Sequence, residues 1–286
     1  MAISKKSLVA FFFSTILLML VSFCSKVSAS DSLSFTYGDF DQDELDLIFQ
    51  GDAKVTSTKV LQLTKTNSEG VPQERTFGRA LYSAPLRLWQ KSTGRLSGFE
   101  STINFVLTSP TTIPGDGFAF FIAPTDTTIP SDTQGGYLGL FSPETALNTS
   151  ASQVVAVEFD TYFGNDNPWD PKYTHIGINV NTIESSAHVK WNRVEGAIGT
   201  ARINYNAGTK KLTVVSSYPG SEVYTVSYVV DLRNVLPEWV RVGLTGASGG
   251  CVEVHSIQVW YFSSSLQYTN NANNKKEEDI YIESVV

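Results

Sequence analysis

Cysteine is scarce in this chain of 286 residues, which contains only Cys24 and Cys251. Cys24 lies in an apolar N-terminal run, so the body of the chain has a single thiol and no partner for an internal disulfide. A packed core or a bound metal must therefore stabilise the fold. Cys251 is predicted to be a small, half-buried apolar residue rather than a catalytic thiol.

Positive charge is also sparse. Lys and Arg number 21 against 28 Asp and Glu, a net charge of −7, and no basic stripe is present. Nucleic acid is therefore excluded as a partner. With 42% hydrophobic and 12% aromatic residues, the chain is too apolar for a disordered protein.

Long apolar runs are limited to one, from Leu8 to Cys24. Lys5 and Lys6 precede it and the small residues 28–30 follow, which is the layout of a secretory signal peptide. A membrane anchor, the alternative, usually needs about 20 apolar residues. We expect residues 1–30 to be a signal peptide, the mature chain to have no membrane span, and the protein to be extracellular or vacuolar.

A sustained 3.6-residue apolar period, which would predict a major helix, is missing. Short runs rich in Val, Ile, Phe, Tyr and Thr recur instead between Gly, Pro, Asn and Asp clusters, a pattern typical of an all-β sandwich. No internal repeat or linker divides the body, which predicts one domain over residues 31–269. The clearest strands are expected at 33–40, 59–64, 99–107, 117–123, 154–159, 176–180, 201–206, 212–217, 223–230 and 257–262.

Two further segments differ from this pattern. Residues 270–278 are polar and of low complexity, so 270–286 is predicted to be a disordered tail, with removal by trimming as the alternative. Asn148-Thr149-Ser150 is an N-glycosylation sequon in a Ser/Thr-rich loop, and Asn148 is the predicted acceptor in a secreted chain.

Two carboxylates follow an apolar run at 154–157. On a strand, Glu158 and Asp160 point to the same face, because side chains alternate with period two. Buried like charges are costly unless they share protons or a cation neutralises them. Asp170 and His175 follow closely, and carboxylates with one imidazole suit manganese, whereas carboxylate and amide oxygens suit calcium.

A glycoside hydrolase is the enzymatic alternative, since some β-sandwich hydrolases carry Glu-x-Asp-x-Glu on one strand. Here the third position is Tyr162, so one of the two main carboxylates is missing. The sequence therefore predicts a non-enzymatic metal site.

Several long segments, in order, resemble the legume lectins over nearly all of the mature chain. They are 47–53, 78–85, 116–121, 135–141, 155–162, 167–171, 175–181 and 235–243. The resemblance implies an antiparallel jelly-roll sandwich, the concanavalin-like lectin fold. It also implies binding to glycans and glycoproteins, and a homodimer or homotetramer.

The resemblance implies two ions and a sugar pocket. Glu158, Asp160, Asp170 and His175 match manganese ligands, with Ser185 holding a metal-bound water. Asp160, the Tyr162 carbonyl, an asparagine and Asp170 match calcium ligands. The pocket would use Asp116 as acceptor, the Gly136 N–H and the calcium asparagine as donors, and the Tyr162 ring for stacking.

Three departures from the family pattern bear on this site. The loop between Tyr162 and Asp170 is longer than in many relatives, so the calcium asparagine is Asn167, which keeps the Asn-Pro-Trp-Asp spacing, or else Asn165. Gly115 replaces the common Ala before Asp116, where a cis peptide bond is expected. The loop 246–255 is shorter than in several galactose-binding members, which leaves the sugar open. The alternative function is a storage or defence relative that has lost sugar binding.

Overall fold

The computed structural model describes residues 31–41 and 45–266. The predicted signal peptide at 1–30 and the tail at 270–286 lie outside these residues. Within them, strands and two short 3-10 turns make up the regular structure, and no helix is long and apolar enough to cross a bilayer. The prediction of an all-β fold is confirmed.

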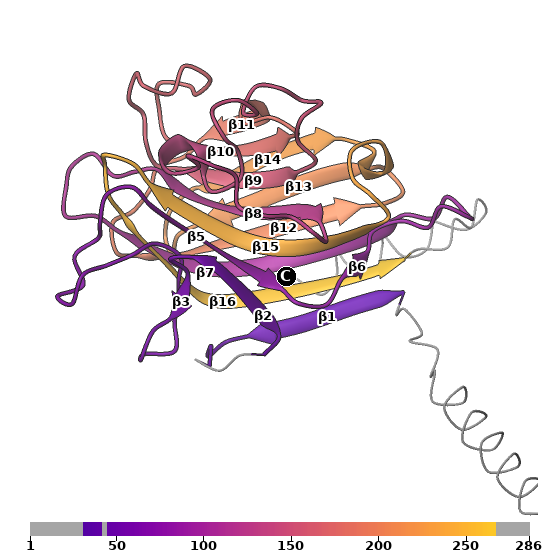
Figure 1. Ribbon diagram of the computed structural model, residues 1–286, viewed down its shortest axis with the longest axis horizontal. Coiled ribbons are helices and arrows are strands. Elements are labelled where there is room, and N and C mark those ends of the chain that lie inside the picture. The colour runs from indigo at the N-terminus through magenta and orange to yellow at the C-terminus, as the bar shows by residue number, and fades with distance from the viewer. Residues whose placement is uncertain (1–30, 42–44, 267–286) are drawn as a thin grey trace, which may run out of the picture. The chain divides into compact units, whose positions relative to one another are not determined.

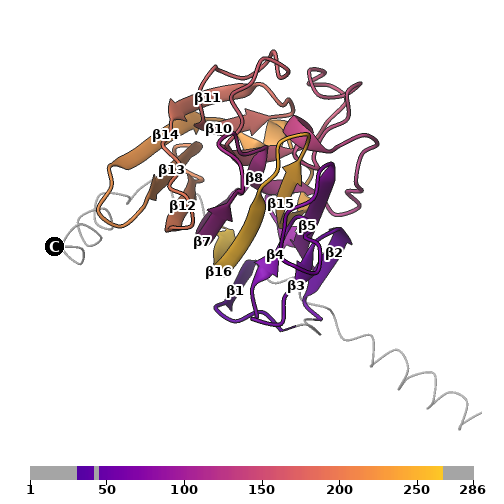
Figure 2. The ribbon, with the colours of Figure 1, turned by 90° about the vertical axis from the view of Figure 1, so that its left-hand side faces the viewer.

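Two antiparallel sheets form the sandwich (Figures 1 and 2). The first, here called the back sheet, runs β14-β13-β12-β7-β16-β4-β3, with β1 paired to β16. Its strands are β1 Ser32–Tyr37, β3 Lys54–Val55, β4 Leu61–Gln62, β7 Ser97–Thr108, β12 Ile198–Asn206, β13 Lys211–Ser217, β14 Val223–Val229 and β16 Val254–Leu266.

The second sheet, here called the front sheet, runs β11-β10-β9-β8-β15-β5-β2, with β6 paired to β15. Its strands are β2 Leu47–Gly51, β5 Thr76–Tyr82, β6 Leu86–Arg87, β8 Gly117–Pro124, β9 Val155–Asp160, β10 His175–Val180, β11 Ser185–Lys190 and β15 Trp239–Ser248. The 3-10 turns are η1 Gly135–Tyr137 and η2 Leu232–Asn234.

All ten strands expected from the sequence are present, and the turn at 206–209 joins β12 to β13 in an antiparallel pair. The sequence patterns missed β2, β3, β5, β6, β11 and β15. Glycine weakens the strand signal in β5 and β15. Gly78 in β5 is needed because a Cβ there would overlap the backbones of Ala53 and Leu63.

Aromatic side chains pack between the two sheets and join them. Phe105 of β7 lies 4.8 Å from Phe118 of β8 and 5.4 Å from Phe159 of β9, measured between ring centroids. Trp191, which is fully buried, packs edge-on against Phe159. These contacts fix β8 and β9 side by side, with Gly117 opposite Asp160, so Asp116, which precedes β8, lies near the end of β9 that carries Glu158 and Asp160.

The outer face of the front sheet has its own apolar cluster. Phe121 and Ala156 of β8 and β9 pack there against Leu138, Phe141 and other residues of the segment that follows β8. Because β8 and β9 are covered on both faces, both faces of these strands carry apolar residues, which explains their continuous apolar runs. This cluster places the segment carrying Gly136 next to the ends of β8 and β9.

Candidate functional site

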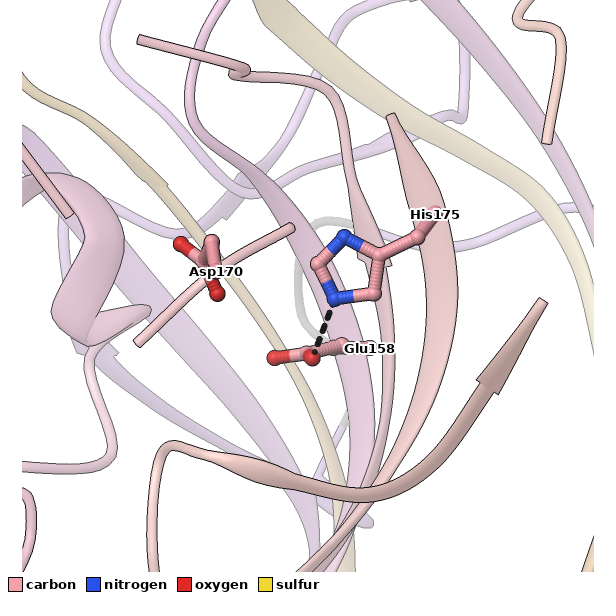
Figure 3. A group of neighbouring side chains, drawn as sticks. All are labelled: Glu158, Asp170 and His175. Carbon is pink, nitrogen blue, oxygen red and sulfur yellow. Dashed lines mark hydrogen bonds and ion pairs between the residues drawn. The ribbon is translucent and has the colours of Figure 1, made fainter. Parts of the chain in front are cut away.

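Three side chains of the types that bind metals converge at the end of the front sheet. Glu158 lies on β9, His175 begins β10, and Asp170 comes from the loop between these strands. Each offers a ligand atom, and these atoms all lie within 4.8 Å of one another (Figure 3). The antiparallel register sets His175 beside Asp160 and Gly177 beside Glu158. Residues that the sequence grouped into one candidate metal site thus form one cluster in the structure.

Asp160 extends this cluster. It is buried, and its Oδ1 lies 4.0 Å from Nδ1 of His175. Asp160 Oδ1, Asp170 Oδ2 and His175 Nδ1 are buried and have no hydrogen-bond partner. Buried polar atoms without partners are rare and costly. The donor set of three carboxylates and one imidazole therefore fits a divalent cation.

Burial and crowding of charge perturb the pKa values of this cluster. Burial and the charges of Asp170 and Glu158 hold the pKa of Asp160 well above its usual range. Burial, together with Glu158, raises the pKa of Asp170 to about 7. Burial disfavours the charged form of His175, but the hydrogen bond and charge of Glu158 outweigh it and raise its pKa. A cation would relieve the repulsion between these carboxylates.

Glu158 is oriented by two neighbours. Asn179 Nδ2 donates to Glu158 Oε2 at 2.7 Å, and Ser185 Oγ donates to Glu158 Oε1 at 2.5 Å. From the family resemblance, Ser185 was predicted to hold a metal-bound water molecule. Asn179 was not identified from the sequence. Asn179 lies two strand positions beyond Gly177, which faces Glu158, so period-two alternation was the available signal.

A cavity of about 360 Å³ adjoins the cluster. All four residues predicted to contact sugar line it: Asp116, Gly136, Tyr162 and Asn167. Asp116 is buried, and its Oδ2 accepts a 2.6 Å hydrogen bond from the backbone N–H of Gly249. The Gly115–Asp116 peptide bond is cis, as expected. Burial raises the pKa of Asp116 to about 7, because its carboxylate is shielded from water.

Asn167 and Asn165 differ clearly in their surroundings. Asn165 is exposed, whereas Asn167 is buried, lines the cavity, and has an unpartnered Nδ2. Its side chain lies directly over Gly136, where a Cβ would overlap it. This geometry favours Asn167 as the calcium asparagine, although its role in metal and sugar binding stays a prediction.

Gly136→Ala is expected to weaken sugar binding at least about tenfold, because the added methyl must displace the Asn167 amide. Isothermal titration with sugar measures the change. Gly250→Ala is the matched control, since a Cβ at Gly250 in the same cavity meets no atom within 4 Å. Equal affinities for the two variants would contradict the placement of Asn167.

Tyr162 forms one wall of the cavity. Its hydroxyl donates to Asp166 Oδ2 at 2.9 Å, and this bond raises the Tyr162 pKa to about 12. The ring lies over Gly164, where a Cβ would overlap it. The cavity is also lined by Asp166, Trp169 and Cys251, which were not predicted from the sequence to contact sugar. Their place depends on loops that meet only in the folded chain.

Other single residues occupy defined places in the fold. Trp191 and Trp260 are fully buried core residues. His255 is buried, and its Nε2 lies 3.2 Å from Glu253 Oε2. Asn148 is exposed in a turn, and Cys251 is a free, half-buried thiol.

Solved structures of lectins share this architecture. Lectin I-B4 from Griffonia simplicifolia in its metal-free form matches with a TM-score of 0.78 and 45% sequence identity, over 82% of this chain and 100% of that chain. Lectin II from Ulex europaeus matches with a TM-score of 0.77 and 43% identity, over 82% and 99%. The fold is therefore the jelly-roll sandwich of the lectins.

The family model of the legume lectin domain matches residues 32–279, and the chain belongs to the legume lectin family. Agglutinin-2 of Cladrastis kentukea is 56% identical over 96% of this chain and 93% of its own length. The mannose/glucose-specific lectin of Centrolobium tomentosum is 54% identical over 84% and 98%. The protein is thus a carbohydrate-binding protein and not an enzyme.

Proposed function

We propose that the cavity lined by Asp116, Gly136, Tyr162 and Asn167 binds one sugar residue of a glycan. The observation that carries this proposal is the gathering of complementary polar groups on one cavity of about 360 Å³. The Asp116 carboxylate would accept from sugar hydroxyls, the Gly136 N–H and Asn167 amide would donate, and the Tyr162 ring would cover an apolar sugar face.

We infer that two cations hold these groups in place, as the family is generally metal-dependent. Manganese would take Glu158, Asp160, Asp170 and His175. Calcium would take Asp160, the Tyr162 carbonyl, Asn167 and Asp170. The unpartnered oxygens of Asp160 and Asp170 support this assignment. The ions would supply positive charge that fixes the pocket before sugar arrives, which reduces the ordering cost of binding.

A mannose- or glucose-type sugar is the proposed ligand. The names of three relatives support it. The lectins are named for mannose, glucose or methyl mannoside and come from Centrolobium tomentosum, Centrolobium microchaete and Arachis hypogaea, at 54%, 52% and 48% identity. Solved lectins in complex with galactose or GalNAc share 43% and 42% identity. In this chain the short loop brings Gly249 next to Gly135 at the lining of the cavity.

Titration of the metal-loaded protein with methyl α-mannoside and methyl α-galactoside tests this proposal. We expect the mannoside to bind at least about tenfold more tightly, a difference of about 1.4 kcal/mol. The reverse order would overturn the proposed sugar but keep the pocket. No binding of either sugar, or of a wider glycan array, would favour the storage or defence relative.

We further propose that the chain follows the secretory pathway and is glycosylated at Asn148. The exposure of Asn148 supports this, together with the signal-like sequence of residues 1–30. The extracellular space or a storage vacuole is the proposed location, and a homodimer or homotetramer the proposed assembly. N-terminal sequencing and peptide mass spectrometry of the native protein test processing and glycosylation, and light scattering tests the assembly.

A further inference from the structure

Beneath the sugar cavity lies a buried carboxylate that the proposed binding groups do not include. Glu253 is fully buried at the end of the short loop 249–252, here called the pocket loop. Thr161 Oγ1 donates to Glu253 Oε2 at 2.8 Å, and His255 Nε2 lies 3.2 Å from the same oxygen. Arg193 forms an ion pair with Glu253 Oε1. One carboxylate therefore contacts three side chains, from separate parts of the fold.

The backbone of Glu253 is held as firmly as its side chain. Thr64 Oγ1 donates to the Glu253 carbonyl at 3.0 Å, and the Glu253 N–H donates to Ser248 Oγ at 3.3 Å. Ser248 Oγ in turn donates to the Gly115 carbonyl at 3.0 Å. Ser248 and Glu253 thus clamp both ends of the pocket loop, and Ser248 connects them to the residue before Asp116.

Thr161 also contacts Asp116 directly. Its N–H donates to the Asp116 carbonyl at 3.0 Å, and Asp116 Oδ2 accepts from Gly249 in the pocket loop at 2.6 Å. Thr161 also stands between Asp160 and Tyr162 in the chain. Thr161 and Glu253 therefore connect three parts of the site. These are the segment with the proposed metal ligands, the pocket aspartate Asp116, and the pocket loop.

We propose that Glu253 is a positioning residue for the sugar pocket, and that its hydrogen bond with Thr161 fixes the pocket loop to the segment carrying Asp160 and Tyr162. A buried carboxylate is costly unless it is paired and hydrogen-bonded. Bonds to an ionised acceptor are short and directional, so they hold a glycine-rich loop in one geometry. The effect on sugar affinity rests on the proposed function, whereas the effect on the loop does not.

The test is made at Thr161, because replacing Glu253 would leave Arg193 buried without its ion-pair partner. Thr161→Val removes the hydroxyl and keeps the shape, while Thr161→Ser keeps the hydroxyl. Tyr205→Phe is the control: it removes a buried hydroxyl that donates to Val230 O at 2.9 Å in the back sheet. All are made in the full mature chain with Ca²⁺ and Mn²⁺ in excess.

Two readouts are compared. The rate at which N-ethylmaleimide alkylates Cys251 reports on the pocket loop, since this thiol lies within it. Titration with methyl α-mannoside reports on the pocket. In T161V we expect alkylation about fivefold faster and affinity about fivefold weaker, because only part of the free energy of the lost hydrogen bond is transmitted to the loop and the pocket. T161S should restore both, and Y205F should lower the Tm without changing either.

The proposal is overturned if T161V alkylates within twofold of wild type, or if T161S behaves like T161V. It is also overturned if Y205F changes both readouts as T161V does, because general loosening of the fold would then be the cause. If wild-type protein binds no sugar, the proposed function fails, while the alkylation rates still decide whether Glu253 and Thr161 hold the loop.

Discussion

Asp116→Asn is expected to weaken sugar binding by at least about 100-fold while the protein stays folded. The carboxylate is the one charged acceptor among the four predicted sugar contacts, and each hydrogen bond to a charged group is worth about 1.5–3 kcal/mol. Two sugar hydroxyls donating to Asp116 account for that loss. An asparagine has nearly the same shape, and its carbonyl oxygen can still accept from Gly249.

The same variant is expected to be more stable than wild type in metal-free protein above neutral pH. Burial raises the pKa of Asp116 from 3.8 to about 7, so the ionised form destabilises the folded state. This penalty is absent below about pH 4, grows between pH 4 and 7, and is complete above 7. The gain in Tm for D116N should follow that profile in thermal melts with chelator.

Asp126→Asn is the matched control for both measurements, because Asp116 precedes β8 and Asp126 follows it at the other end. D126N should leave sugar affinity within twofold of wild type. If D116N retained affinity within tenfold of wild type, Asp116 would not be the principal acceptor. If its Tm fell at pH 8, the burial of an unfavourable charge would be the wrong description.

Removal of the metal ions is expected to abolish sugar binding and to lower the Tm by on the order of 10 °C. A ligand present at about 1,000 times its Kd stabilises a fold by about 4 kcal/mol, and 1 kcal/mol is about 2–4 °C for a chain of this size. Without ions, the buried carboxylates of Asp160 and Asp170 repel each other. Thermal melts and sugar titrations before and after chelation measure both effects.

Metal affinity is expected to fall as the pH is lowered. The raised pKa of Asp160, that of Asp170 at about 7, and the raised pKa of His175 mean that protons compete with the ions from about neutral pH downwards. Metal titrations between pH 8 and 5 test this. Unchanged affinity over that range would contradict direct binding by these groups.

The variants His175→Ala and His188→Ala test which of two neighbouring histidines binds manganese. His188 is exposed, and its ring lies 5.6 Å from that of His175. We expect H175A to lose manganese binding and H188A to retain it. Equal loss in both variants would show that the cluster needs both rings, which the proposed ligand set does not include.

Local periodicity predicted a large part of this molecule. The strands with continuous or alternating apolar residues, such as β8, β9 and β12, were identified because burial imposes a period that the sequence carries. Alternation also placed Glu158 and Asp160 on one face, and like charges so close implied a cation. The resemblance to legume lectins added the ligand assignments.

Strands β5 and β15 were missed because their glycines weaken the strand signal. Gly78, for example, is required by the close approach of Ala53 and Leu63, which a local pattern does not record. The preference for Asn167 over Asn165 rested on spacing alone, because both are polar loop residues in the sequence. The burial of Asn167 and its packing over Gly136 distinguish the two in the structure.

What the sequence by itself determined was therefore the β class, together with the residues proposed as metal ligands and as the lining of the pocket. What only the tertiary structure decided was how they meet. The Thr161–Glu253 hydrogen bond joins residues 92 positions apart, and Gly249 reaches Asp116 across 133. Contacts at such separations depend on how the two sheets and their loops pack, and that packing leaves no periodic signal in the chain.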